Sequence, residues 1–395
     1  MAGSDRIRVA MPLGPAPVDH DGVSDYVAHL VRALDEAGVT VVPVPVRPTG
    51  GGSPLRWFTA TVRAAERVRR LDVDLVHVQF APSAYRFSGL PGLLPFRLPR
   101  GVPLVTTVHE YGSWAVPGWL PGPLWSVLER AGLWDRETGR LVPASATVVV
   151  TNDGHEAAVR GRCGVPTAHV PLAPNVTDSP GAADAGRRLR AELGLSPGTP
   201  LLVFFGFVHP VKGIRHLIGA LPALRRTHPD LRLLVAGGFT SQAMPEAEAR
   251  VFRDELTALT HRYGVADAVT FTGYLPPDRA SAALHAADVV VLPFTAGVTV
   301  KSGALLAALG HGRPTVVTAP EDGGDELHRS GAVAVVPRRR DSDALAATVG
   351  RVLADPVLRR RLAERGRTLA AGHAWPRVAT AHRDLYQRLL GRPDG

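Results

Sequence analysis

The sequence has 395 residues, 45% of them hydrophobic and 21% charged, and this length suits two globular domains of roughly 150–200 residues better than one. The formal net charge of +9 comes from basic residues that are spread over many segments without interleaved aromatic residues. This pattern argues against nucleic-acid binding and favours an anionic small molecule or a peripheral membrane contact.

The single cysteine, Cys163, excludes an intramolecular disulfide and a cysteine-based metal site. No apolar run reaches the roughly 20 residues that span a bilayer, and the first residues lead into a strand without the apolar core of a signal peptide. We therefore expect a cytoplasmic protein.

Along the first half, short apolar runs alternate with longer amphipathic segments, the pattern of parallel sheets covered by helices on both faces. Strands are expected over Ile7–Pro12, Val39–Val46, Leu75–Phe80, Val102–His109 and Ala146–Thr151, and helices over Val23–Ala37 and Leu55–Arg70. Asn, Asp, Ser, Pro and Gly cluster in Pro174–Ala185, which predicts a linker.

The second half repeats this alternation. Strands are expected over Leu201–Phe205, Leu231–Ala236, Val269–Thr272, Val289–Pro293 and Thr315–Thr318, with helices over Gly213–Thr227, Met244–Tyr263, Ser302–Gly310, Asp343–Leu353 and Pro356–Gly372. The fold class is therefore α/β, with two Rossmann-like doubly wound domains that leave a ligand-binding cleft between them.

Two loops of the second half carry the only lysines among 45 basic residues, Lys212 and Lys301. The first loop runs from Gly206 through His209 to Gly213, where a helix begins. Glycine lets the backbone approach a ligand, and a helix start offers unpaired N–H groups. Together with Lys212 this loop could bind a diphosphate, although a solvated lysine at a turn is the competing interpretation.

The second loop, Thr295–Gly303, leads from an apolar strand into the next helix. Lys301 and Ser302 stand where that helix starts, a position that favours an anion held by the backbone amides, the Ser302 hydroxyl and the ammonium group. A capped helix with a surface lysine is the alternative. The presence of two such loops favours phosphate binding.

In the first half, Asp21, Gly22 and Ser24 follow the first strand, and Gly22 could bring the backbone close to a sugar diphosphate. His109 stands at the end of a strand, where doubly wound sheets expose reactive groups, and could hydrogen-bond the transferred sugar or the acceptor. A plain turn and a structural histidine are the alternatives. Four tryptophans follow His109, namely Trp114, Trp119, Trp125 and Trp134. Their flat faces suit sugars, apolar aglycones or a membrane interface. Simple core packing is the alternative.

These features resemble the retaining glycosyltransferases of family four, which have the GT-B fold, and the resemblance covers nearly the whole chain. It is carried by the Gly22 loop, Asp74–Gln79, His109, the loop Gly206–Gly213, Val269–Tyr274, Ala286–Pro293, Gly312–Pro314, and Trp375 with the following helix. It implies an acceptor-binding domain over 1–178, completed by a C-terminal helix 376–395, and a nucleotide-sugar-binding domain over 186–375.

The implied function is metal-independent transfer of a sugar from a nucleotide-diphosphate sugar to a hydroxyl or amine acceptor with retention of configuration, without a cofactor. Negative charge on the leaving diphosphate would be stabilised by the lysines and the helix start. The catalytic candidates are His109, Lys212 and Lys301. The donor-binding candidates are Gly22, Gly206, His209, Lys212, Gly273, Tyr274, Leu275, Thr299, Val300, Lys301, Ser302 and Gly303. The acceptor-binding candidates are Asp21, Ser24, Glu110 and Trp114.

The sequence departs from the family pattern at three positions. Thr299 and Ala307 stand where the family usually has two glutamates, the second of which holds the nucleotide ribose, and Phe207 stands where an arginine is common. Two alternatives follow: an inert protein that binds nucleotide sugars, and a nucleotide-sugar epimerase on the same fold.

Overall fold

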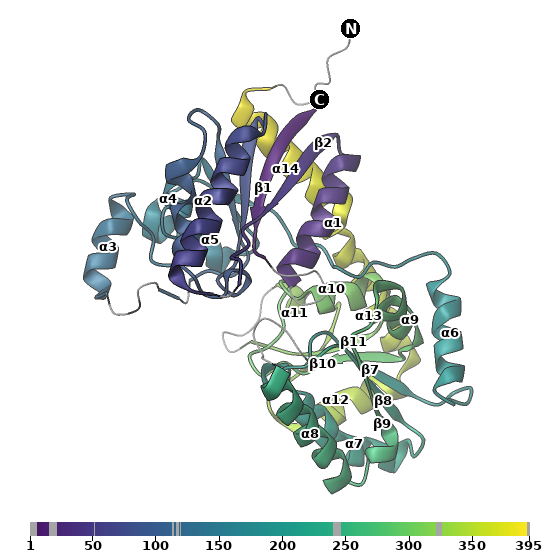
Figure 1. Ribbon diagram of the computed structural model, residues 1–395. Coiled ribbons are helices and arrows are strands. Elements are labelled where there is room, and N and C mark those ends of the chain that lie inside the picture. The colour runs from purple at the N-terminus through teal and green to yellow at the C-terminus, as the bar shows by residue number, and fades with distance from the viewer. Residues whose placement is uncertain are drawn as a thin grey trace. The chain divides into compact units, whose positions relative to one another are not determined.

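The structure is a computed structural model that describes residues 6–15, 22–50, 52–112, 114–115, 118, 120–239, 246–320 and 326–392. The chain forms two compact units (Figure 1). Unit 1 comprises Met1–Leu172 and Trp375–Gly395, and unit 2 comprises Ala173–Ala374.

Unit 1 contains a six-stranded parallel sheet in the order β2-β1-β3-β4-β5-β6. Its strands are β1 (Ile7–Leu13), β2 (Val39–Pro45), β3 (Leu75–Phe80), β4 (Leu104–Val108), β5 (Thr147–Val150) and β6 (Thr167–His169). Its helices are α1 (Gly22–Glu36), α2 (Pro54–Arg70), α3 (Gly122–Arg130), α4 (Leu141–Ala144), α5 (Asp153–Cys163) and α14 (Trp375–Leu390), with 3-10 turns η2 (Ser83–Tyr85) and η3 (Leu90–Arg97).

Unit 2 contains a second six-stranded parallel sheet, in the order β12-β11-β10-β7-β8-β9. Its strands are β7 (Leu201–Phe205), β8 (Arg232–Ala236), β9 (Val269–Gly273), β10 (Val289–Leu292), β11 (Thr315–Thr318) and β12 (Ala334–Val336). Its helices are α6 (Ala182–Glu192), α7 (Ile214–Thr227), α8 (Glu246–Arg262), α9 (Pro277–Ala286), α10 (Gly303–Gly310), α11 (Glu326–Arg329), α12 (Ser342–Ala354) and α13 (Pro356–Ala371), with 3-10 turns η4 (Pro210–Lys212) and η5 (Ala266–Ala268).

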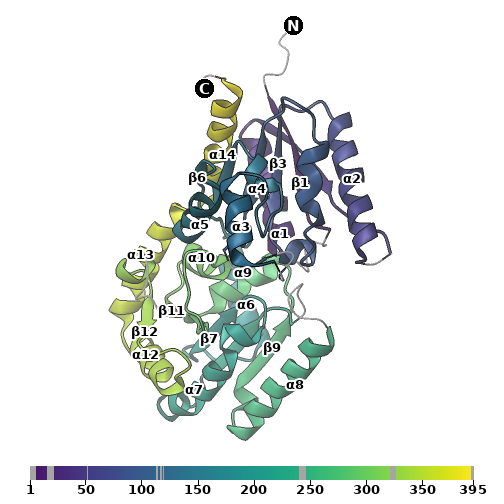
Figure 2. The same cartoon turned by 90° about the vertical axis from the view of Figure 1, so that its left-hand side faces the viewer.

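Helices cover both faces of each sheet (Figures 1 and 2), so the central strands are buried on both sides and are mostly apolar. Strands β10 and β11, for example, are buried along their whole length. Among the described residues, no helix is both long and apolar enough to cross a membrane.

Each sheet has one point where the strand order reverses direction. In unit 2 the chain runs outward from β7 to β8 and β9, then returns to place β10 on the other side of β7. In unit 1 the corresponding neighbours are β1 and β3. The loops that leave two such strands diverge to opposite faces of the sheet, and ligands of open parallel sheets bind in the crevice between them.

The last helix returns to unit 1 and packs against α1 (Figure 1). Trp375 at its start contacts Tyr26 and stacks on His29, with ring centroids 5.0 and 5.4 Å apart. Its end is tied to the sheet by Arg392, which pairs with Asp74 at 2.8 Å. The first and last segments of the chain thus share one core.

Candidate functional site

The two lysine-bearing loops leave β7 and β10, the neighbouring strands at which the sheet of unit 2 reverses its order. The loops are joined directly, because the Thr295 amide and hydroxyl both donate to the Val211 carbonyl, at 2.9 and 3.1 Å. Gly213 permits this approach: it has φ +70°, and a Cβ there would lie 1.9 Å from the Pro293 carbonyl oxygen. Only glycine fits such a position, so Gly213 fixes the distance between the loops.

Lys212 lies at this junction. Its ammonium nitrogen is 3.8 Å from the centre of the Phe294 ring, and the side chain is half-buried. Burial lowers the pKa of the Lys212 amine to about 8. Within the described part of the chain, no carboxylate forms an ion pair with it. A half-buried cation that pairs only with an aromatic face leaves its charge available for an anion.

Helix α10 begins beside the same loops. Ser302 is its N-cap, and the hydroxyl accepts a hydrogen bond from the Leu305 amide at 3.3 Å. A Cβ on Gly206 would lie 3.4 Å from the Cβ of Ala304, so the end of β7 faces the first turn of this helix. The amides of that first turn and the positive end of the helix therefore lie next to the Gly206 loop.

The remaining residues of the second loop precede α10. Lys301 is exposed, and its backbone amide donates to the Thr299 hydroxyl at 3.4 Å. Val300 and Gly303 are half-buried beside it. Ala307, for which the resemblance implies a ribose-binding glutamate at the matching family position, is 1% exposed and lies in the core of unit 2.

On the other side of β7, the ends of β8 and β9 bring further glycines together. A Cβ on Gly237 would lie 1.9 Å from the Gly206 carbonyl oxygen, and Gly237 forms a bridge with Gly273. Tyr274 follows, 52% exposed, and Leu275 packs against the core of unit 2. The loops that carry the predicted donor-binding residues of unit 2 thus lie along one edge of one sheet.

His209 belongs to the first loop and also stabilises its conformation. Its Nδ1 accepts a hydrogen bond from the Val211 amide at 3.3 Å, which caps η4. Burial and the nearby Lys212 charge lower its pKa. The imidazole is therefore neutral at physiological pH.

In unit 1, His109 follows β4 and is half-buried. Its Nε2 donates to the Gln79 side-chain oxygen at 2.9 Å, and its ring meets the Tyr26 ring edge-on, with centroids 5.2 Å apart. Burial lowers the pKa of His109 to about 3. Because Nε2 carries the proton that Gln79 accepts, Nδ1 of this neutral ring is a hydrogen-bond acceptor.

The other predicted residues of unit 1 lie near the same edge of its sheet. Ser24 is buried and Gly22 exposed in the first turn of α1, whereas Asp21 lies outside the described residues. Glu110 accepts hydrogen bonds from the Ser83 hydroxyl at 2.9 and 3.0 Å. Trp114 meets the Phe87 ring edge-on at 5.5 Å. His109 and these residues belong to unit 1, and both lysines belong to unit 2.

The sequence analysis gave no role to a buried network of side-chain hydrogen bonds that includes the partner of His109, Gln79. The Gln79 amide nitrogen lies 3.3 Å from Nε2 of His77, which also contacts the Thr107 hydroxyl at 2.7 Å. Nδ1 of His77 bonds the Tyr386 hydroxyl at 2.6 Å. This network of hydrogen bonds joins His109 to α14. Its signal in the sequence is a histidine and a glutamine at alternate positions of an otherwise apolar strand, which places both on one face of the sheet.

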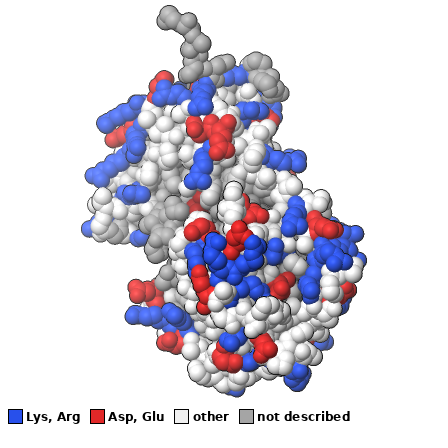
Figure 3. Space-filling model, turned by 90° about the vertical axis from the view of Figure 1, so that its right-hand side faces the viewer, with Lys and Arg blue, Asp and Glu red and all other residues white. Residues whose placement is uncertain are grey.

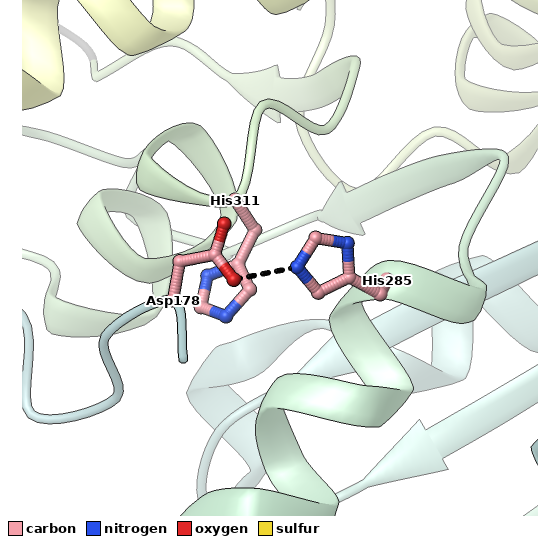
Figure 4. Close-up of side chains that lie close together, drawn as sticks. All are labelled: Asp178, His285 and His311. Carbon is pink, nitrogen blue, oxygen red and sulfur yellow. Dashed lines mark hydrogen bonds and ion pairs between the residues drawn. The ribbon is translucent and has the colours of Figure 1, made fainter. Parts of the chain in front are cut away.

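A second polar group, Asp178, His285 and His311, lies in unit 2 (Figure 4). His285 bonds Asp178 at 2.7 Å, while His311 donates to the Ala307 carbonyl at 2.7 Å and lies 2.8 Å from the Ser281 hydroxyl. Although burial raises it, the hydrogen bond from His285 holds the pKa of the Asp178 carboxyl below its usual range. The group ties the chain before α6 to α9 and to the end of α10.

On the face shown in Figure 3, Asp and Glu side chains lie among the Lys and Arg side chains of both units. In unit 2, arginines form ion pairs, for example Arg225 with Asp267 at 2.8 Å and Arg279 with Glu192 at 2.6 Å. Such exposed pairs neutralise one another locally. The visible charge on this face is therefore mixed in sign.

Two Rossmann-like parallel sheets, one in each unit, with cationic loops at the switch point of unit 2, are the arrangement of the GT-B fold. The comparisons agree. Residues 16–176 match the model of the "Glycosyl transferase 4-like domain", and residues 199–355 match that of "Glycosyl transferases group 1". The chain belongs to this family of glycosyltransferases.

The relatives span nearly the whole chain. It is 31% identical to the D-inositol 3-phosphate glycosyltransferase of Nocardia farcinica, over 97% of this chain and 84% of that protein. It is 29% identical to the glycogen synthase of Mycobacterium tuberculosis, over 98% and 87%. Among solved structures it is similar to the sucrose-phosphate synthase of Thermosynechococcus elongatus, with a TM-score of 0.72 and 22% identity over 98% of this chain and all of that one.

Proposed function

We propose that this glycosyltransferase takes its sugar from a nucleotide-diphosphate sugar and transfers it to a hydroxyl or amine acceptor, with retention of configuration and without a metal ion. The observation that carries the proposal is Lys212, a half-buried ammonium without a carboxylate partner among the described residues. It stands where two loops meet at the switch point of unit 2.

The chemistry needs positive charge where the leaving diphosphate becomes more negative. Lys212 supplies it, because its pKa of about 8 leaves the amine mostly protonated at neutral pH. Lys301 and the first-turn amides of α10 add charge from the neighbouring loop. These groups offset the charge that a divalent cation offsets in metal-dependent transferases.

His109 acts as a neutral hydrogen-bonding group and carries no positive charge. With its pKa lowered to about 3 it remains an uncharged imidazole, and Gln79 holds the proton on Nε2. Nδ1 can then accept a hydrogen bond from a hydroxyl of the transferred sugar or of the acceptor. His109 would orient a reactant, and the charge stabilisation would come from the lysines.

The presence of only two lysines gives a direct test of the donor site. Protein labelled with nitrogen-15 in lysine alone has two side-chain signals to follow by nuclear magnetic resonance. Uridine, adenosine and guanosine diphosphates are each titrated, and the matching diphosphate should shift both signals, whereas the nucleoside without phosphate should shift neither. Two unchanged lysine signals at saturating nucleotide would refute the phosphate-binding assignment.

Turnover is tested with single variants. Lys212→Ala and Lys301→Ala should each weaken diphosphate binding and slow sugar transfer by about 10- to 100-fold, the usual cost of losing a charged hydrogen bond. Arg226→Ala removes the same charge from the exposed far end of α7 and should change neither quantity. The anomeric configuration of the product, read from proton couplings, distinguishes retention from inversion. A product that still carries the diphosphate would indicate epimerisation instead.

A further inference from the structure

Three side chains of unit 2 bring together atoms of the kind that bind metal ions (Figure 4). A carboxylate oxygen of Asp178 and one ring nitrogen each of His285 and His311 lie within 4.8 Å of one another. They come from the segment before α6, from α9 and from the end of α10. In the described part of the chain, no other group of three histidine, cysteine, aspartate or glutamate side chains brings its ligand atoms so close together.

His311 has the bonding pattern of a metal ligand. The residue is 1% exposed, and its Nδ1 donates to the Ala307 carbonyl at 2.7 Å, one turn earlier in α10. This bond fixes the proton of the neutral ring on Nδ1, so Nε2 carries the lone pair. Histidines that bind metals usually donate their other N–H to a carbonyl or carboxylate in this way. Nε2 accepts from the Ser281 hydroxyl at 2.8 Å, and rotation of that hydroxyl frees the lone pair.

His285 and Asp178 supply the side of the cluster that solvent can reach. Nε2 of His285 lies 2.7 Å from the Asp178 carboxylate, and the two side chains are 10% and 49% exposed. A proton occupies the position between them. A cation can approach beside the exposed carboxylate and take that position, because the imidazole can carry its proton on Nδ1 instead. Entry therefore requires no opening of the core of unit 2.

The backbone around the cluster is held in place by protein contacts alone. The Arg313 guanidinium donates to the His311 carbonyl at 3.1 Å and to the His285 carbonyl at 3.2 Å, which joins the two histidine backbones. On the other side, helix α6 packs closely on His285, since a Cβ on Gly186 would lie 2.8 Å from the His285 Cβ. Ligands that are already in position lose little conformational entropy on binding. The Arg313 charge opposes a cation, so we expect a dissociation constant in the micromolar range.

We propose that Asp178, His285 and His311 form a binding site for Zn²⁺. Two imidazoles and one carboxylate are a common protein ligand set for this ion, with water as the fourth ligand. The ring nitrogens disfavour Ca²⁺ and Mg²⁺, which prefer oxygen. Bonds of about 2.0–2.2 Å place the ligand atoms of a tetrahedral zinc ion roughly 3.3–3.6 Å apart. The cluster, with separations between 2.7 and 4.8 Å, therefore needs shifts of only about 1 Å to bind the ion.

A zinc ion at this place would stabilise unit 2 and take no part in the sugar transfer. It would join the segment before α6 to α9 and to the end of α10. Helix α10 has 8 residues, so its ends are about 12 Å apart, and the ion would lie at the end opposite the donor loops. A cation is favourable there because the C-terminal end of a helix carries partial negative charge. The inference goes beyond the proposed sugar transfer and does not depend on it.

Binding is tested with the untagged full chain, after treatment with a chelator and exchange into chelator-free buffer. Calorimetric titration with Zn²⁺ should show one saturable site, and the occupied chain should unfold at a higher temperature. Co²⁺ alone should give the visible absorption bands of a four-coordinate ion, which report the ligand geometry directly.

Single variants assign the ligands. His285→Gln keeps a hydrogen-bond donor for Asp178 but removes the imidazole, and should weaken Zn²⁺ binding at least about tenfold, as should Asp178→Asn. Ser281→Ala keeps all three ligands and removes the hydroxyl that competes for Nε2 of His311, so it should bind Zn²⁺ at least as tightly as the wild type. The control is His261→Ala, which removes an exposed histidine of α8 and should leave the affinity unchanged.

Three results would overturn the zinc proposal: no saturable Zn²⁺ binding by the wild-type chain, equal affinity in the wild type and His285→Gln, or weaker binding in His261→Ala. The two lysine signals of unit 2 are titrated separately with nucleoside diphosphate in the zinc-free chain. Their failure to respond would count against the proposed sugar transfer and would leave the zinc result unaffected.

Discussion

Partial burial makes the positive charge of Lys212 unfavourable in the free protein. Its amine lies 3.8 Å from the centre of the Phe294 ring, and burial lowers the pKa to about 8. The electron-rich face of the ring recovers part of the lost hydration. A bound diphosphate would favour the ammonium form far more strongly and raise the pKa again. Ligand binding and protonation of this one residue are therefore coupled.

This coupling predicts the pH dependence of diphosphate binding. Below pH 8 the free enzyme already holds the Lys212 proton. Above it the proton must be taken up on binding, so affinity should fall by up to about tenfold per pH unit between pH 8 and 9.5. Lys212→Arg retains its charge throughout and should lose this slope. The measurement is calorimetric titration of nucleoside diphosphate from pH 7 to 9.5. The same slope in both proteins would show that another group is responsible.

At the scale of secondary structure, helix α14 is joined to the sheet of unit 1 by a buried hydrogen bond between the Tyr386 hydroxyl and Nδ1 of His77, at 2.6 Å. Tyr386 has one of the largest fully buried side chains of the chain. The bond continues through Gln79 to His109, so the position of the last helix bears on the candidate site.

Tyr386→Phe should therefore destabilise unit 1 by about 1–3 kcal/mol, because it leaves a buried imidazole nitrogen without a partner. Urea unfolding followed by tryptophan fluorescence measures this change. Tyr263→Phe makes the same change in unit 2, at a residue that is 44% exposed, and should leave the tryptophan-monitored transition of unit 1 within about 0.5 kcal/mol of the wild type. A Tyr386→Phe protein as stable as the wild type would mean that the bond contributes no net stability.

The elements that could be predicted from the sequence include strands that are buried on both faces. Strands β7 and β10 are continuous apolar runs, whereas β3 is interrupted by His77 and Gln79 and β11 begins and ends with threonine, and all four formed where the pattern placed them, within a residue. Strand β6 was missed because its three residues are partly exposed and give no apolar signal. Helix α9 was missed because its buried face consists largely of alanine, and α6 begins inside the segment expected to be a linker.

The candidate site was predictable only where the backbone imposes a residue type. Gly213 and the lysine beside it were visible because a turn at φ +70° requires glycine. The bond between Thr295 and Val211, which joins the two loops, connects residues 84 positions apart and leaves no local pattern.

At the scale of the whole molecule, the two units carry separate natural reporters. All six tryptophans lie in unit 1, and both lysines lie in unit 2. Tryptophan fluorescence therefore follows the unfolding of unit 1 by itself, while the lysine signals follow unit 2. This separation matters because two-unit chains need not unfold in one step.

Unit 1 also contains three histidines whose pKa values are lowered, chiefly by burial: the buried His77 well below the usual range, the half-buried His109 to about 3 and the buried His382 to about 4. In the unfolded chain a histidine has a pKa of about 6.5. Between these values the unfolded state binds more protons than the folded state, so stability should fall as the pH drops below about 6.5. Each histidine contributes up to about 1.4 kcal/mol per pH unit.

The tryptophan-monitored urea transition of unit 1 should therefore move to lower urea concentration between pH 7.5 and 5. His382→Phe removes one of the three groups, and the Nε2 that it replaces has no hydrogen-bond partner among the described residues. At pH 8 this variant should be about as stable as the wild type, because position 382 is uncharged in both the folded and the unfolded state. Below pH 6.5 its stability should depend less steeply on pH, by the contribution of about one proton. A wild-type midpoint that stays constant down to pH 5, or an equal slope in the variant, would mean that these rings gain protons without unfolding.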